Sequence, residues 1–223
     1  MCNPFKAAVI GVFTLAVASL PGQAQMNGTN WMPLRVEYKI HFPYLTNESS
    51  RYWVTNGVYH CLVFSNDPPF RAGNTTQPRT EQRFLPDYTH GDIQYQAMLM
   101  ANTNENSYCI FQIHSGDAQS PQFGATTFML FWFASDGGSV YDYSRKELAA
   151  NLGNNWFQLN VEHNVDAHTI QVWINQKPVW TQKDNGAGDF YMKDGVYVQK
   201  HHPTFQMDTC ISNILMWERG PER

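Results

Sequence analysis

The chain has 223 residues, a length that fits one domain of the larger all-β kind. Its formal net charge is −4, which argues against nucleic acid or an anionic membrane surface as a partner. Hydrophobic residues make up 43% of the sequence and aromatic residues 14%, enough to build a large core.

The N-terminus has the pattern of a secretory signal peptide over residues 1–24. Lys6 supplies the positive charge, residues 7–20 are apolar, and Gly22-Gln23-Ala24 offers a small-x-small cleavage site. The apolar run is shorter than the ~20 residues that a spanning helix needs. We therefore expect a secreted, extracellular protein with no membrane association after the signal is removed. Its net charge would then be about −5, because Lys6 is the single charged residue lost.

The cysteine and asparagine patterns are consistent with secretion. Cys2 would leave with the signal, and three cysteines remain: Cys61, Cys109 and Cys210. An odd number in an oxidising compartment predicts one disulfide and one buried thiol, with the pairing left open. Three Asn-x-Ser/Thr sequons are consistent with glycosylation: Asn27, Asn47 and Asn74.

Short apolar or alternating segments, separated by turn signals, predict about a dozen strands. In chain order they are residues 34–42, 57–64, 79–83, 92–100, 109–114, 126–133, 139–143, 156–163, 169–175, 178–182, 193–199 and 209–217. The last strand is expected beside an N-terminal one, and residues 145–152 are the one segment with helical character. The pattern predicts a single all-β domain over residues 25–223, a two-sheet antiparallel β-jelly roll of the concanavalin-like sandwich type.

Three of these strands have an unusual polar face. Residues two apart on a strand share a face, which groups the following side chains: Arg79, Glu81 and Arg83; Gln112 and His114; Lys193, Tyr197 and Gln199. Taken singly, each group has an ordinary structural explanation, such as a cross-strand salt bridge or a packed tyrosine. Together they predict one site on the concave sheet.

Other chemistries fit the sequence less well. His201 and His202 are adjacent but have no companion zinc ligands at the usual spacings. There is no Gly-x-Ser-x-Gly elbow for a serine hydrolase. A retaining glycosidase needs two close carboxylates, and Glu81 stands between two arginines that would keep it ionised.

The combination of Arg, Gln, His and Tyr suits β-elimination in a uronic acid polymer. That reaction removes the weakly acidic proton on carbon 5, beside a carboxylate. Arginine and amide donors at the carboxylate stabilise the charge that develops. A tyrosine or histidine takes the proton, and a tyrosine delivers one to the leaving oxygen on carbon 4.

These segments also carry a resemblance. Arg79-Thr80-Glu81-Gln82-Arg83, Gln112-Ile113-His114 and residues 191–199 resemble the signature segments of the alginate-lyase-like jelly rolls, the family 7 polysaccharide lyases. Gln82 replaces a usual aliphatic residue, Asp194 a usual alanine and Val198 a usual asparagine. Segments near residues 56–81, 156–161 and 208–216 are more similar to a sister group, the family 20 glucuronan lyases and plant citrate-binding proteins. The resemblance covers about residues 33–217.

The resemblance implies roles for the site residues. Gln112 and one or both of Arg79 and Arg83 would neutralise the substrate carboxylate, with Arg79 favoured. His114 and Tyr197 would transfer protons. Four residues would line the groove: Glu81, Arg83, Lys193 and Gln199. No metal or organic cofactor is expected. The expected partner is an acidic polysaccharide, and the expected state is a monomer.

Two alternatives remain open at this point. The citrate-binding group does not keep the histidine of the Gln-x-His segment, so His114 favours an enzyme over a carboxylate- or glycan-binding protein without turnover. The flanking segments favour glucuronan over alginate as the substrate. Endo or exo action, sequon occupancy and the disulfide pairing are not determined by the sequence.

Overall fold

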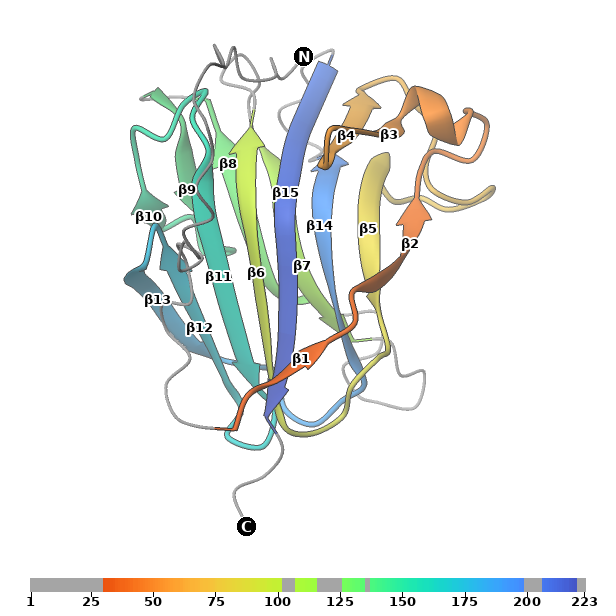
Figure 1. The fold of residues 1–223 in the computed structure, drawn as a ribbon. Helices are drawn as coiled ribbons and strands as arrows, with labels where there is room; N and C mark the ends of the chain where they lie inside the picture. Colours follow the sequence, from red (N-terminus) through yellow and green to blue (C-terminus); the bar gives the residue numbers. More distant parts are fainter. Residues whose placement is uncertain (1–29, 102–106, 116–125, 135–136, 199–205, 220–223) are drawn as a thin grey trace, which may run out of the picture.

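The computed structural model describes residues 30–101, 107–115, 126–134, 137–198 and 206–219. These residues form two antiparallel sheets packed face to face, as predicted (Figure 1). The predicted signal segment 1–24 and Gln199 lie outside the described residues, so both stay predictions. No helix in the described part of the chain has the length and apolar character needed to cross a membrane.

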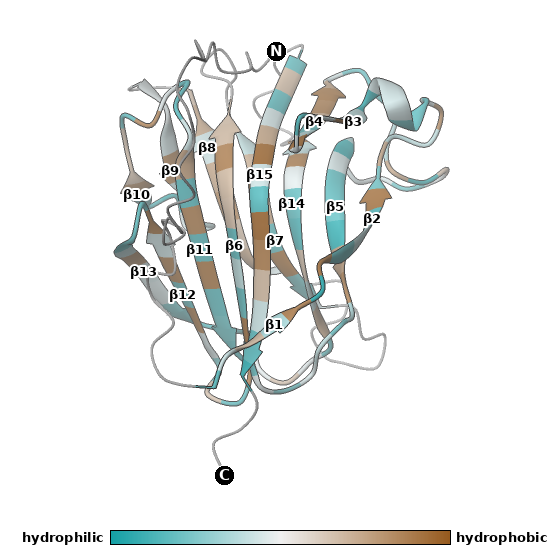
Figure 2. Cartoon of the chain, viewed as in Figure 1, coloured by the Kyte–Doolittle hydropathy of each residue, from teal (hydrophilic) through white to brown (hydrophobic). Residues whose placement is uncertain are grey.

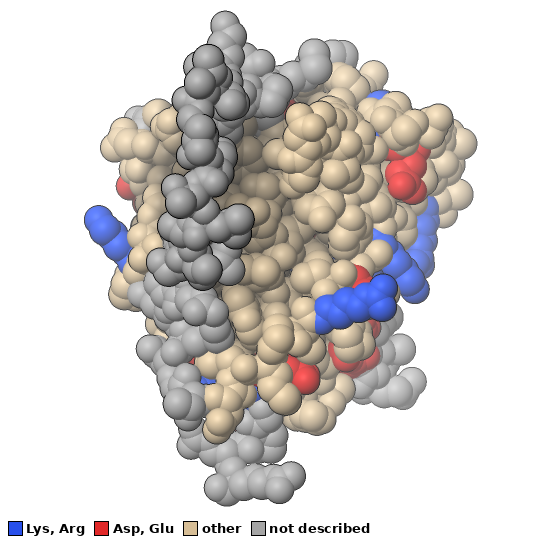
Figure 3. Space-filling view, viewed as in Figure 1, with Lys and Arg blue, Asp and Glu red and all other residues tan. Residues whose placement is uncertain are grey.

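The eight-stranded sheet lies in front in Figure 1. Its strands in spatial order are β13 (Lys177–Lys183), β12 (Thr169–Ile174), β11 (Phe157–Asn164), β6 (Asp92–Ala101), β15 (Gln206–Arg219), β4 (Val58–Phe64) and β3 (Tyr52–Thr55), with β1 (Met32–Leu34) paired to β15. The pairing of β15 with β1 confirms the prediction that the last strand lies beside an N-terminal one. Where the outer surface of this sheet is visible in Figure 3 it is mostly uncharged.

The seven-stranded sheet lies behind. Its strands in spatial order are β10 (Glu147–Ala149), β9 (Ser139–Tyr141), β8 (Thr126–Phe133), β7 (Tyr108–Ser115), β14 (Phe190–Val198), β5 (Arg79–Leu85) and β2 (Glu37–His41). The three strands with polar faces, β7, β14 and β5, are therefore direct neighbours although they are far apart in the sequence. In Figure 2 β5 is hydrophilic along most of its length.

The core lies between the two sheets. Large side chains from both inner faces meet there, among them Tyr95, Leu99, Phe111, Phe128 and Trp132, all nearly inaccessible to solvent. Each such side chain contributes about 1.5–3 kcal/mol on burial. Because strand residues alternate between faces, this core fixes which side chains of β5, β7 and β14 point outward.

Residues 34–42 were predicted as one strand, but the structure divides them between the two sheets. Leu34, in β1, pairs with Met216 of the eight-stranded sheet, whereas Lys39, in β2, pairs with Arg83 of the seven-stranded sheet. Alternation in the sequence reports which face of a strand is buried, and it carries no information on which sheet the strand joins. The crossing places β2 at the edge of the sheet with the polar faces.

The helix predicted over residues 145–152 is wrong. Arg145 has a φ of 69°, in the left-handed region that interrupts a helix. The Asp142 carboxylate accepts the backbone N–H of Lys146 at 2.7 Å and the Ser144 hydroxyl at 2.8 Å, which forms a turn instead. The chain then continues as β10, which pairs with β9.

The predicted disulfide is also wrong for two of the three cysteines. Cys61 and Cys109 are free, buried thiols, so neither is bonded to the other or to Cys210. Cys61 lies in the core between the sheets, whereas Cys109 packs with Met129 and Phe131 in a separate cluster. Burial raises the pKa of both thiols, which keeps them protonated.

Candidate active site

The sheet register brings the three polar segments into one ladder. Lys193 of β14 pairs with Arg83 of β5 on one side and with Gln112 of β7 on the other. Further along β14, Tyr197 pairs with Arg79. These five side chains share the outer face of the sheet and lie close together, as the sequence predicted.

These side chains line a groove of about 580 Å³ on the outer face of the seven-stranded sheet. Six of the predicted residues line it: Arg79, Arg83, Gln112, His114, Lys193 and Tyr197. Glu81 lies beneath them and is 2% exposed. A hollow of this size, with several polar groups converging in it, is the usual form of a ligand site.

Glu81 organises the floor of the groove. Its carboxylate accepts hydrogen bonds from the Gln112 amide and from the Lys193 ammonium, the latter at 3.0 Å, and it pairs with the Arg79 guanidinium at 3.4 Å. Burial alone would raise the pKa of this carboxyl, but Lys193 and Arg79 outweigh burial and hold the pKa below its usual value. Glu81 is therefore ionised and fixes three neighbours that face the groove.

Lys193 was predicted to line the groove, and the structure places it at the floor with only 1% exposure. Burial lowers the pKa of its ammonium, and Glu81 acts in the opposite direction. The ammonium is thus committed to Glu81, and its positive field acts on the groups above it.

Tyr197 lies against Arg79, whose guanidinium carbon is 4.1 Å from the ring centroid. Burial raises the pKa of the Tyr197 phenol, and this effect is larger than the lowering by Arg79. The phenol therefore holds its proton at neutral pH, which suits a proton donor. The adjacent cation stabilises the phenolate whenever the proton leaves.

His114 is held in one tautomer. Its Nδ1 is 2.5 Å from the backbone carbonyl of Ser115, which can only accept, so Nδ1 carries the hydrogen and Nε2 carries the lone pair. The ring stacks on Tyr191 at 5.2 Å. Burial, followed by the charge of Lys193, lowers the pKa of the imidazole to about 4. His114 is therefore neutral at pH 7 and has a free base to offer.

Arg83 lines the groove and also forms an ion pair with a carboxylate. Its guanidinium binds the carboxylate of Asp87, which follows β5, and lies 4.0 Å above the Tyr191 ring. The Asp87 carboxylate thus compensates the charge of Arg83. Arg79, which shares Glu81 with Lys193, is left with more net positive field toward a ligand.

The groove is positive in an acidic protein. Four cationic side chains line it and two carboxylates pair with them: Arg71, Arg79, Arg83 and Lys193 against Glu81 and Asp87. Two positive charges remain uncompensated within the described residues. The site therefore favours an anion although the whole chain is negative.

The sequence analysis did not predict every lining residue, and among those it missed are His41, Phe70 and Arg71. His41 is the last residue of β2 and pairs with Glu81. Its outward orientation followed from the alternation of residues 34–42, but the sheet that β2 joins did not. Phe70 and Arg71 stand in a loop rich in Gly, Asn and Pro, whose path over the sheet has no periodic signal.

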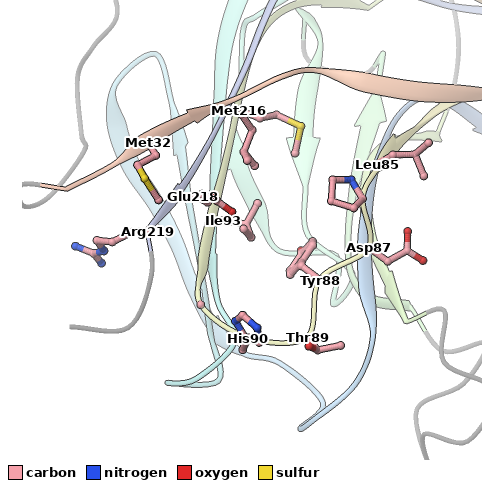
Figure 4. A pocket seen from close by; sticks show the side chains of 13 residues that line it. Met32, Leu85, Asp87, Tyr88, Thr89, His90, Ile93, Met216, Glu218 and Arg219 are labelled. Carbon is pink, nitrogen blue, oxygen red and sulfur yellow. The ribbon is translucent and has the colours of Figure 1, made fainter. Parts of the chain in front are cut away.

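A second cavity, of about 310 Å³, lies between β1, the loop after β5 and the end of β15 (Figure 4). Its wall is largely apolar, with Leu34, Ile93 and Met216 among the contributors. None of the six predicted groove residues lines it. Among the described residues no three His, Cys, Asp or Glu side chains gather to form a metal site.

Comparison with known proteins gives a consistent result. The family model described as alginate lyase matches residues 32–216. A citrate-binding protein from Hevea brasiliensis is 27% identical over 194 residues, which are 86% of this chain and 78% of the relative.

Two solved alginate lyases are similar in fold. That from Pseudomonas aeruginosa is 17% identical, with a TM-score of 0.65 over 82% of this chain and 98% of its own. That from Corynebacterium sp. is 15% identical, with a TM-score of 0.64 over 85% and 94% of the two chains. At such low identity these structures establish the shared jelly-roll fold alone.

Proposed function

This chain belongs to the alginate lyase family, and from that premise we propose that it is a secreted lyase that cleaves a β-1,4-linked polyuronate by β-elimination. The observation that carries the proposal is the groove itself. It combines an excess of positive charge with a neutral histidine whose Nε2 carries the lone pair and a tyrosine that holds its proton.

The first step is to bind the carboxylate of the reacting sugar. Arg79 and the Gln112 amide are held by Glu81, and both residues line the groove. As the proton leaves carbon 5, negative charge spreads into that carboxylate, and fixed donors stabilise it more strongly than they stabilise the ground state. The floor ammonium of Lys193 adds to this field.

The bond changes balance without a further reactant. A base removes the proton from carbon 5, the electron pair forms a double bond between carbons 4 and 5, and the bond from carbon 4 to the glycosidic oxygen breaks. An acid then gives a proton to that oxygen. The products are a new sugar hydroxyl and an unsaturated uronate end, with no water consumed.

Stereochemistry assigns the proton transfers. In guluronate the proton and the leaving oxygen lie on opposite sides, so His114 is the base and Tyr197 the acid, which matches their resting protonation. In glucuronate and mannuronate they lie on the same side, and Tyr197 serves as base and then acid. For that second route the phenol must first release its proton to solvent, with Arg79 against its ring to stabilise the anion.

Glucuronan is the favoured substrate and alginate the second, because the segments that flank the groove strands are more similar to the glucuronan lyase group. Secretion gives access to such polymers. The signal-like segment over residues 1–24 supports it.

A second candidate is a carboxylate-binding protein without turnover. It is favoured by the citrate-binding relative from Hevea brasiliensis and by the two uncompensated positive charges of the groove. It gives no reason for a neutral His114 and a protonated Tyr197 to line the same groove, and for that reason the enzyme is the better interpretation.

The test is incubation of purified protein with a panel of glucuronan, alginate and a neutral β-1,4-glucan, followed by ultraviolet absorbance of the conjugated uronate. We expect absorbance to rise with glucuronan fastest and not with the neutral polymer. Binding of the polyuronates without any rise would favour the carboxylate-binding protein. New reducing ends without absorbance would identify a hydrolase.

A further inference from the structure

One cation of the groove, Arg71, differs from the others in its pairing with carboxylates. Arg79 and Lys193 pair with Glu81, and Arg83 pairs with Asp87. Arg71 also lines the groove and is exposed, but no carboxylate in the described part of the chain pairs with it. Its guanidinium lies over the Phe70 ring, 5.0 Å from the centroid.

A second polar group without a partner lies next to it. The ring of His41 stacks on Phe70 at 4.1 Å with an interplanar angle of 22°. Its Nδ1 is buried and has no hydrogen-bond partner among the described residues, and Nε2 is the ring nitrogen left to meet a ligand. Burial and then Lys193 lower the pKa of this imidazole to about 4, so it is neutral at pH 7.

Phe70 holds both groups in place. It contacts the imidazole and the guanidinium and is therefore engaged as a support for them. The loop around it is fixed by backbone hydrogen bonds from Tyr44 to Pro69 and from Asn74 to Arg71, each 3.1 Å long. Groups that are positioned before binding lose little conformational entropy when a ligand arrives.

The chemistry of this wall fits one kind of ligand. A free guanidinium binds a carboxylate, and a neutral imidazole exchanges hydrogen bonds with a hydroxyl. A sugar that carries both groups is a uronate. The wall belongs to β2 and its neighbouring loop, whereas the reacting carboxylate is assigned to Arg79 and Gln112 on β5 and β7.

We propose that His41, Phe70 and Arg71 form a second uronate subsite, which binds a sugar next to the one that reacts. Arg71 takes the carboxylate of that sugar, and His41 takes a hydroxyl. The inference rests on the proposed lyase function and adds the residues that bind a neighbouring sugar of the same polyuronate. The preferred polymer carries carboxylates on neighbouring units, and a polymer whose neighbouring sugars are neutral is a poor substrate.

The test compares Arg71→Gln with the natural protein on oligouronates of increasing length. An exposed ion pair is worth up to ~1 kcal/mol, so KM should rise about 5-fold on long oligomers. The turnover number kcat should stay unchanged, because the subsite binds ground state and transition state alike. The shortest oligomer that is cleaved does not reach the subsite and should show no change.

Two further variants sharpen the result. His41→Phe keeps the ring stack on Phe70 and removes the nitrogen atoms, and a KM about 2- to 10-fold higher is expected, again on long oligomers. Lys177→Gln, on β13 of the other sheet, removes the same charge away from the groove and should leave KM unchanged. A loss in kcat for Arg71→Gln, or an equal KM change for every length, would overturn the subsite.

Binding measurements separate this proposal from the lyase function. If the natural protein releases no unsaturated product from any polyuronate, calorimetric titration with long oligouronates still tests the wall. Weaker binding by Arg71→Gln would then support the subsite although the lyase proposal had failed. Equal binding by the two proteins would overturn it in either case.

Discussion

Two buried carboxyl groups on neighbouring strands of the same sheet have pKa values shifted in opposite directions. Glu81 of β5 lies under the groove, where its carboxylate accepts hydrogen bonds from Gln112 and Lys193 and forms an ion pair with Arg79. Asp194 of β14 faces the core, where the Tyr95 hydroxyl donates to Oδ2 at 2.6 Å. Its Oδ1 has no partner from another described residue.

The difference shows what makes one side of this sheet a site. Burial raises the pKa of Asp194 to about 8, so at neutral pH this carboxyl is mostly protonated and behaves as a polar core residue. Cations hold the pKa of Glu81 below its usual value. The groove side is thus built to keep buried charge, and the core side removes it by protonation.

The largest effect is expected from Tyr197→Phe, with Tyr95→Phe as its matched control on the core side. Removal of the groove hydroxyl should lower turnover ~10²–10⁴-fold, the usual contribution of a proton-transfer group, with little change in stability. Removal of the core hydroxyl leaves Asp194 without its donor and should cost about 1–3 kcal/mol of stability with turnover intact. Steady-state rates and urea unfolding measure the pair, and near-natural turnover by Tyr197→Phe would refute its role.

Glu81→Gln should come next in size. It leaves Lys193 and Arg79 without their counter-ion, and breaking a buried ion pair costs about 3–5 kcal/mol. Turnover should fall as well, because Gln112 and Arg79 lose the group that orients them. Urea unfolding gives the stability change.

The double variant Glu81→Gln with Lys193→Met is the control for this explanation. It removes the orphaned ammonium and should recover part of the lost stability. If the double variant were no more stable than the single one, the cost would not come from an unpaired buried charge.

Asp194→Asn should change the pH dependence of stability rather than its level at one pH. The pKa of Asp194 is about 8 in the folded protein and near 3.8 in the unfolded chain. Its protonated carboxyl therefore contributes its full stabilisation of the fold below pH 3.8, and this contribution is lost as the pH rises to about 8. Between those values the natural protein should lose up to about 1.4 kcal/mol per pH unit relative to the variant. Parallel stability curves for the two proteins from pH 4 to pH 8 would show that Asp194 is not protonated in the fold.

The smallest effect concerns the acid limit of activity. His114 must be neutral to accept a proton, and its pKa is lowered to about 4, so kcat/KM on an alginate rich in guluronate should hold from pH 7 to about pH 5 and fall near pH 4. Tryptophan fluorescence checks that the fold persists there. An activity loss centred at the ordinary histidine value of 6.5 would contradict the burial argument.

The sequence was sufficient for most of the strands and for the polar faces, because a period of two is visible in residues such as Gln112 and His114. It was insufficient wherever the outcome depends on which segments become neighbours. The split of residues 34–42 and the resulting position of His41 depend on a sheet crossing. The protonation of Asp194 depends on its burial between the sheets, which raises the pKa of the carboxyl more than the hydrogen bond from Tyr95 of the opposite sheet lowers it.

The most direct test of the account is the mass of the products from glucuronan. β-Elimination consumes no water, so the masses of the two products should sum to the mass of the parent chain. The new non-reducing end should be unsaturated. The natural protein should give these products, and Tyr197→Phe should give almost none under the same conditions. Products heavier by one water, or bound polymer that is never cleaved, would contradict the account.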